Sequence, residues 1–148
     1  IAQALLGDPD VLVVDEPTAG LDPHERMRFR SLLASLSGLR IVVLSTHILD
    51  DVAQSCPDVA VLAGGRLAYH GSTNGLTSAA AGQTYRVPPG TDVPAEATVV
   101  NAVTQAGGTE YRVVSPTAVP GGQRVEPSLE DGYVALLQND SGNSAVVS

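Results

Sequence analysis

The sequence has no tryptophan, one phenylalanine and one cysteine, and only 3% of its residues are aromatic. We therefore expect any hydrophobic core to be aliphatic. The single cysteine, Cys56, excludes an internal disulfide and is consistent with a reducing compartment. No apolar run approaches the roughly 18 residues that a membrane-spanning helix needs, and no signal peptide is visible.

Basic residues are scarce as well. Eight Lys and Arg stand against 16 Asp and Glu, and the formal net charge is -8. A nucleic-acid-binding surface needs a basic patch, so this charge argues against nucleic acid as a partner. With 148 residues, 43% hydrophobic and 16% charged, the chain has a globular composition and the length of one domain or of parts of two.

The strongest functional signal lies in residues 11–23, Val-Leu-Val-Val-Asp-Glu-Pro-Thr-Ala-Gly-Leu-Asp-Pro. The apolar run 11–14 predicts a strand buried on both faces, which Pro17 ends. Asp15 and Glu16 follow at its carboxyl end, where open parallel sheets bind ligands. Acids there suit a nucleotide phosphate site. Asp15 can hold Mg²⁺, directly or through water, and Glu16 can orient or deprotonate the attacking water.

A helix and a second strand follow. Residues 24–37 predict an amphipathic helix, and residues 41–46, Ile-Val-Val-Leu-Ser-Thr, predict another buried strand. A strand–helix–strand unit of this length is a crossover, so we expect two parallel, adjacent strands. His47 then lies at the same sheet edge as the two acids. A lone histidine at a strand end is usually structural, but the spacing from the Asp-Glu pair favours a functional one, able to donate or accept a hydrogen bond near neutral pH.

These segments resemble the Walker B segment, D-loop and H-loop of ATP-binding-cassette (ABC) ATPases. Residues 11–23 match the family pattern of an apolar strand, Asp-Glu-Pro-Thr and Gly-Leu-Asp at every position, and residues 45–47, Ser-Thr-His, are similar to the H-loop. The resemblance implies an α/β fold, a partial P-loop NTPase with a parallel-sheet core, that uses ATP and Mg²⁺. It implies that Glu16 and His47 are catalytic, that Asp15, Asp22 and His47 bind the nucleotide, and that Asp15 holds the metal.

Three motifs of that family are missing. The sequence has no glycine-rich loop ending in Gly-Lys-Ser/Thr, no Gln loop and no Ser-Gly-Gly signature motif. Residues 1–6 predict a short helix that resembles the tail of the helix beginning at the signature motif, with Gln3 where Arg is common. The resemblance therefore implies the second half of an ATPase domain in a fragment of a longer protein. We expect this chain not to bind ATP tightly by itself.

The ATPase part is expected to continue to residue 81. Residues 48–56 predict a short helix, whose Asp50 and Asp51 near the start favour the helix dipole. A hairpin with a Gly64-Gly65 turn follows, and then a weak helix around residues 74–81. In the ABC family this hairpin closes the ATPase core.

Residues 82–138 are predicted to form a small α+β accessory domain. Extended runs occupy residues 84–87, 97–104 and 109–115. A helix after Ser128, the expected N-cap, carries Asp131 at its third position. Residues 139–148 are small and polar, and we expect a flexible tail.

Residues 126–131, Glu-Pro-Ser-Leu-Glu-Asp, resemble the C-terminal end of ATPase subunits of the ABC-2 exporter branch, although Gly132 stands where that family often has a bulky residue. The resemblance implies an ATPase subunit that powers export of a drug, lipid or polysaccharide. Its partners would be a second ATPase domain, as a homodimer or heterodimer, and a separate transmembrane permease at the cytoplasmic face of the membrane. The alternatives are a soluble ABC ATPase outside transport, a non-catalytic fragment that binds a partner subunit, and, for the tail, an unrelated capped helix.

Overall fold

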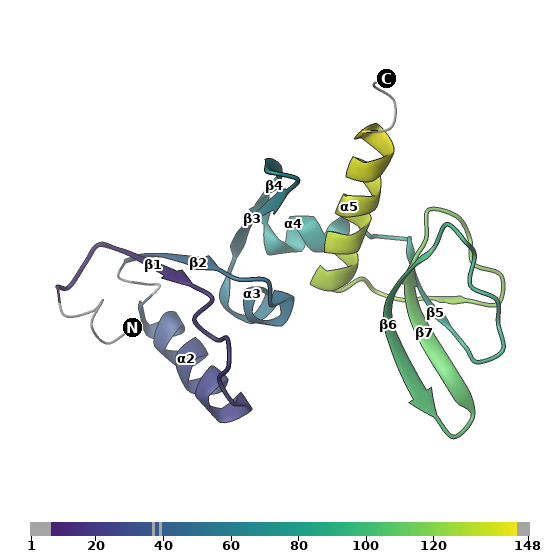
Figure 1. The fold of residues 1–148 in the computed structure, drawn as a ribbon, viewed down its shortest axis with the longest axis horizontal. Coiled ribbons are helices and arrows are strands. Elements are labelled where there is room, and N and C mark those ends of the chain that lie inside the picture. Colours follow the sequence, from purple (N-terminus) through teal and green to yellow (C-terminus); the bar gives the residue numbers. More distant parts are fainter. Residues whose placement is uncertain (1–6, 37, 39, 145–148) are drawn as a thin grey trace. The chain divides into compact units, whose positions relative to one another are not determined.

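The computed structural model describes residues 7–36, 38 and 40–144, which form a mixed α/β fold with several sheets (Figure 1). The chain divides into two compact units, residues 1–56 and 57–148. The predicted domain boundary after residue 81 falls inside the second unit and stays a prediction. The predicted helix over residues 1–6 lies outside the described residues. Within the described ranges, no helix has the length and apolar character needed to cross a bilayer.

A parallel strand pair organises the first unit. Strand β1 (Val11–Asp15) and strand β2 (Ile41–Ser45) are hydrogen-bonded in parallel, with Val11 opposite Ile41 and Asp15 opposite Ser45. Helix α2 (Pro23–Leu36) connects them, and helix α3 (Leu49–Ser55) follows β2. The predicted crossover and parallel pairing are confirmed for these two strands. A larger parallel core stays a prediction.

The prediction that these strands are buried on both faces is wrong for the described residues. Leu12 and Val14 are buried, but Val11 is 50% and Val13 67% exposed. Their β2 neighbours Ile41 and Val43 are 64% and 47% exposed on the matching face. Alternate residues of a strand point to opposite faces of the sheet. Because the described elements cover only one of these faces, only every second residue of the run is buried.

Helix α2 begins with a capping box. The Glu25 amide donates to Asp22 Oδ1 at 2.8 Å, and the Asp22 amide donates to Glu25 Oε2 at 3.2 Å. This reciprocal pair satisfies amides that the helix itself leaves without partners. Pro23 fits the first helical position, where no amide hydrogen is needed. The sequence Asp-Pro-His-Glu therefore determines where α2 starts.

The second unit opens with an antiparallel hairpin of β3 (Asp58–Ala63) and β4 (Arg66–Ser72). Gly64 and Gly65 both have positive φ, 54° and 75°, as the two-residue turn requires. Helix α4 (Thr73–Ser78) follows, and the Ser72 side chain caps it by accepting from the Gly75 amide. The predicted hairpin is confirmed, and the predicted weak helix forms over a shorter range.

A four-stranded antiparallel sheet and a helix complete this unit. Its strands are β5 (Thr84–Val87), β6 (Thr98–Gln105), β7 (Gly108–Val114) and β8 (Gln123–Arg124), in the order β6-β7-β5-β8. Helix α5 (Leu129–Ser144) packs against α4 (Figure 1) and extends past residue 138, where the ordered part was expected to end. Flexibility beyond that point stays a prediction. One buried cluster joins Tyr85, Val87, Val113 and Val119, and another joins Ala80, Val114 and Ala135. The expectation of an aliphatic core is therefore wrong at Tyr85.

A buried ion pair fastens α5 to the sheet. Asp131 is fully buried and accepts from Arg112 Nη2 at 2.6 Å and Nε at 3.0 Å. The Ser128 amide and hydroxyl donate to the same carboxylate at 2.6 and 2.8 Å. The Ser128 hydroxyl also accepts from the Asp131 amide at 3.3 Å, which confirms the predicted N-cap. Burial alone would raise the pKa of Asp131, but the hydrogen bonds from Arg112 and Ser128 outweigh it and hold that pKa below its usual range.

We therefore expect the second unit to lose stability in acid. Because the folded-state pKa of Asp131 is lowered, its contribution is present above the unfolded value of about 3.9 and is lost as pH falls through the folded value. The lowered pKa of Glu96, caused by its hydrogen bond from Thr117, acts in the same direction. Urea unfolding followed by tyrosine fluorescence from pH 6 to pH 2 measures this. Asp92→Asn should leave the profile unchanged, and a flat wild-type profile below pH 4 would contradict the prediction.

Candidate functional site

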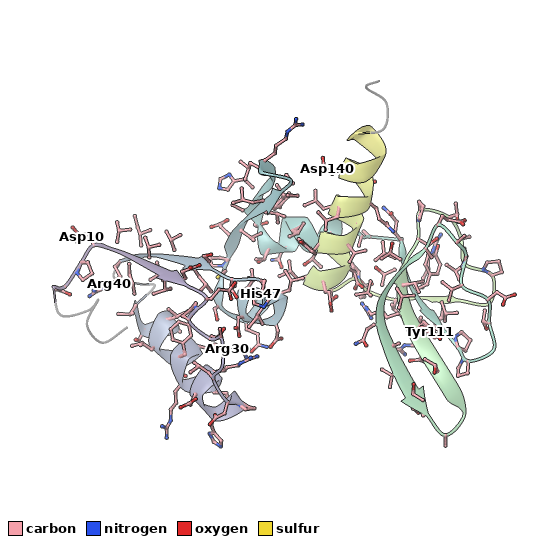
Figure 2. All side chains as sticks on the ribbon, viewed as in Figure 1. Asp10, Arg30, Arg40, His47, Tyr111 and Asp140 are labelled. Carbon is pink, nitrogen blue, oxygen red and sulfur yellow. The ribbon has the colours of Figure 1, made fainter. Side chains whose placement is uncertain are left out.

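Glu16 and His47 are in direct contact at the carboxyl ends of β1 and β2. The Glu16 Oε1 atom lies 2.7 Å from His47 Nδ1 and accepts from the His47 backbone amide at 3.1 Å. The Thr46 hydroxyl lies 3.4 Å from Oε2 of the same carboxylate. Figure 2 labels His47 beside the end of β2. The structure thus brings together two site residues that the sequence predicted, although they are separated by the whole of α2.

The backbone of Glu16 is held in an unusual conformation. Its φ is +42°, in the left-handed region that residues other than glycine rarely adopt. The Glu16 amide donates to the Ser45 carbonyl at 2.8 Å, which extends the strand pairing by one residue. Such strain costs about 1–3 kcal/mol and persists where surrounding contacts fix it, most often at functional sites. Here the contacts to residues 45–47 fix it.

The pair has the chemical parts of an oriented base. Glu16 supplies a carboxylate that is 36% exposed, and the His47 side chain is 78% exposed. Because Nδ1 faces the carboxylate, the ring's other nitrogen, Nε2, is the one left to meet a ligand. An accessible carboxylate held by an imidazole can position a water molecule and take its proton.

Asp15 is the carboxylate that could hold a metal ion. It ends β1, is exposed, and makes no side-chain hydrogen bond with the described residues. Its oxygens suit Mg²⁺, which usually takes one or two carboxylates and fills its other positions with water and substrate phosphates. The part of the chain that the structure describes has no group of three or more metal-ligating side chains. The expected role of Asp15 in holding Mg²⁺ stays a prediction.

Asp22, the remaining predicted site residue, has a structural contact of its own. Its Oδ1 caps α2, as described above, and the side chain is exposed. No hydrogen bond joins it to Glu16 or His47 among the described residues. Its expected role in nucleotide binding across a dimer interface stays a prediction.

Sequence reasoning missed a buried cluster next to the Glu16–His47 pair. Asp51, expected to serve the helix dipole, is 2% exposed and accepts from the Thr18 hydroxyl at 2.6 Å. Arg30 Nη2 and Nε both donate to Asp51 Oδ1, at 2.7 and 3.0 Å, and Figure 2 labels Arg30 on α2. Burial alone would raise the pKa of Asp51, but the hydrogen bonds from Thr18 and Arg30 outweigh it and lower that pKa. In the sequence, the one feature that could have pointed to this cluster is the position of Asp51, four residues after His47.

The chain is similar to several ATP-binding proteins of transporters. A Nod factor export ATP-binding protein from Ralstonia nicotianae is 38% identical over 104 residues, which are 68% of this chain and 32% of that protein. A Nod factor export ATP-binding protein from Rhizobium johnstonii is 41% identical over 80 residues, 51% of this chain and 25% of that protein. An energy-coupling factor transporter ATP-binding protein from Streptococcus thermophilus is 49% identical over 74 residues, 49% of this chain and 26% of that protein.

The matched segment spans about a quarter to a third of the length of these curated relatives. No protein-family model matches the chain. The relatives therefore identify the proteins to which part of this chain is homologous. Their names describe proteins that are several times longer than the matched segment.

Proposed function

We propose that this chain, whose homologues are ATP-binding proteins of ABC transporters, holds the second half of the ATPase domain and a C-terminal appendage of an ATP-hydrolysing subunit that powers such a transporter. The observation that carries the proposal is the contact of Glu16 with His47, at 2.7 Å, at the end of a strand that runs into Asp-Glu-Pro-Thr. That contact supplies an oriented carboxylate where a parallel strand pair ends, the place where α/β sheets bind ligands.

Each site residue has a distinct proposed task. Glu16 orients the attacking water and accepts its proton, since its carboxylate is accessible and fixed. His47 bridges Glu16 and the terminal phosphate of ATP, with Nδ1 on the carboxylate and Nε2 toward the nucleotide. Asp15 would hold Mg²⁺, which would supply positive charge against the phosphates of the nucleotide. Asp22 contributes to the nucleotide site across the interface with a second ATPase domain.

The proposed partners follow from the proteins that the chain resembles. They are a second ATPase domain, as a homodimer or heterodimer, and a separate transmembrane permease at the cytoplasmic face of the membrane. Export is supported by the names of two relatives, which are Nod factor export proteins, and the ABC-2 type is supported by the tail sequence of residues 126–131. Closing and reopening of the ATPase dimer would drive the permease.

Two assays test this function. The full-length protein that contains this chain, with a phosphate-binding loop and a signature motif, should release phosphate from ATP only with Mg²⁺. The isolated 148-residue chain should bind ATP more weakly than the low micromolar range in calorimetry, because the loop that supplies most phosphate contacts is missing from its sequence. Tight binding by the isolated chain would refute the half-domain assignment. Absence of turnover in the full-length protein would favour a non-catalytic subunit that only binds a partner.

A further inference from the structure

We propose that Asp51 is a positioning residue that keeps Glu16 beside His47 by joining the segments that carry them. The expected effect on ATP turnover rests on the proposed function. The effect on the contact between Glu16 and His47 can be measured without ATP. Among the described residues, no hydrogen bond joins Asp51 to Glu16 or to His47. Asp51 acts through Thr18, two residues after Glu16, and through helix α3, which starts just after His47.

The first part of the argument is the burial of the charge. Asp51 is 2% exposed, and Thr18 is 1% exposed. A buried carboxylate is costly unless its oxygens are satisfied. Here Oδ2 accepts from Thr18 at 2.6 Å, and Oδ1 accepts two hydrogen bonds from Arg30. The geometry of the carboxylate is therefore fixed from two sides, by the loop after β1 and by α2.

The second part is the path from Asp51 to the pair. The Asp51 amide donates to the Ile48 carbonyl at 3.1 Å, and the Ile48 amide donates to the Thr46 hydroxyl at 3.1 Å. That hydroxyl is the group 3.4 Å from Glu16 Oε2. On the other side, the Ala19 amide donates to the Glu16 carbonyl at 3.1 Å, next to Thr18. Hydrogen bonds therefore link Asp51 to Glu16 along two paths, one through Thr18 and one through Ile48 and Thr46, the residues on either side of His47.

The third part is the strain at Glu16. A residue with φ of +42° relaxes when the contacts that hold it weaken. The Thr18–Asp51 bond anchors the turn immediately after Glu16, so its loss should let the carboxylate leave His47. The Arg30–Asp51 pair would remain, which keeps α2 and α3 joined. The two effects of the cluster, packing and positioning, can therefore be separated by changing Thr18 alone.

Nitrogen NMR of the isolated chain tests the joining directly. The measured quantity is the pair of ring nitrogen chemical shifts of His47. The Glu16→Ala variant, in which the imidazole has no carboxylate partner, gives the reference values. Thr18→Val, which removes the hydroxyl and keeps the side-chain shape, should move the His47 ring nitrogen shifts toward that reference. Thr18→Ser restores the donor and should return them to the wild-type values.

The matched control is Thr77→Val, the same change at a hydroxyl that donates to the Thr73 carbonyl at 3.0 Å in the second unit. It should leave the His47 shifts unchanged. If Thr18→Val does not fold, Thr18→Ala takes its place, because it puts no new group beside the carboxylate. Wild-type His47 shifts in a folded Thr18→Val or Thr18→Ala chain would overturn the proposal.

Kinetics in the full-length protein provide the second readout. Thr18→Val should lower kcat by about 10- to 100-fold, the cost of a small misplacement of catalytic groups, while KM for ATP changes little. Thr18→Ser should recover most of the loss, and Thr77→Val should have no effect. An equal loss from both Val variants would indicate a general loss of folded protein and would overturn the positioning role. Absence of turnover in the wild type would refute the proposed function alone, since the NMR result does not depend on it.

Discussion

Glu16→Gln is expected to lower ATP turnover of the full-length protein by about 10²- to 10⁴-fold, the usual contribution of a general base. The amide has nearly the same shape as the carboxylate, so the backbone at Glu16 and the contact to the His47 amide can persist. What it loses is the ability to take a proton from water. Because the substitution leaves Asp15 and His47 in place, ATP affinity should stay near the wild-type value. Phosphate release at saturating Mg²⁺-ATP and nucleotide binding, measured on the same preparation, check both expectations.

A matched control is Glu110→Gln, the same chemical change on β7, where the carboxylate lies 3.4 Å from Arg86 in a half-exposed ion pair. Its turnover should equal that of the wild type, since exposed ion pairs contribute little. Turnover retained in Glu16→Gln would refute the role assigned to Glu16, whatever the behaviour of the control.

The parts of the fold that short-range patterns determine were predictable. The Gly64-Gly65 hairpin and the N-cap at Ser128 each depend on residues within a few positions of one another. The crossover from β1 to β2 follows from the order of an apolar strand, a helix and a second apolar strand along the chain. Apolar periodicity, paired glycines and capping residues express preferences that neighbouring residues alone decide. The capping box at Asp22 and Glu25 belongs to the same class, although the resemblance to a D-loop drew the interpretation of Asp22 toward nucleotide binding.

Burial was the less predictable part. A run such as residues 11–14 fits a strand covered on one face or on both, because the run itself carries no information about how many elements surround it. The exposed fractions of Val11 and Val13, 50% and 67%, depend on what lies against the sheet. Strand β8 was missed for a related reason: a two-residue strand has no periodicity and exists only through its pairing with β5.

The site was predictable as far as its family pattern extends. Glu16 and His47 were predicted to lie at the same sheet edge, and the structure places Glu16 Oε1 2.7 Å from His47 Nδ1 there. The burial and contacts of Asp51 were not predictable, because its partners lie 33 and 21 residues away, on the loop after β1 and on α2. A buried ion pair arises from tertiary packing, and a single sequence without the fold shows only two acids at the start of a helix.

Gly132→Ala is expected to destabilise the second unit by at least about 3 kcal/mol, at or beyond the upper end of the usual cost of overpacking. A Cβ on Gly132 would lie 2.1 Å from the Leu76 carbonyl oxygen and 2.8 Å from Thr77 Cα. These are backbone atoms of α4, so no rotamer change can relieve the overlap and α5 must move. The intrinsic gain of about 1 kcal/mol for Ala over Gly in a helix is smaller than this cost. The same close approach explains why a bulky residue is absent at this position.

Urea unfolding with tyrosine fluorescence measures the effect, since all 4 tyrosines of the chain lie in the second unit. The matched control is Gly107→Ala, in the turn between β6 and β7, where an added Cβ meets no atom within 4 Å and φ is not left-handed. It should unfold at the wild-type urea concentration. If Gly132→Ala unfolds at the same urea concentration as Gly107→Ala, then the packing of α5 does not depend on its close backbone contact with α4. In that case the Arg112–Asp131 pair, and not the close helix crossing, is what holds α5 in this unit.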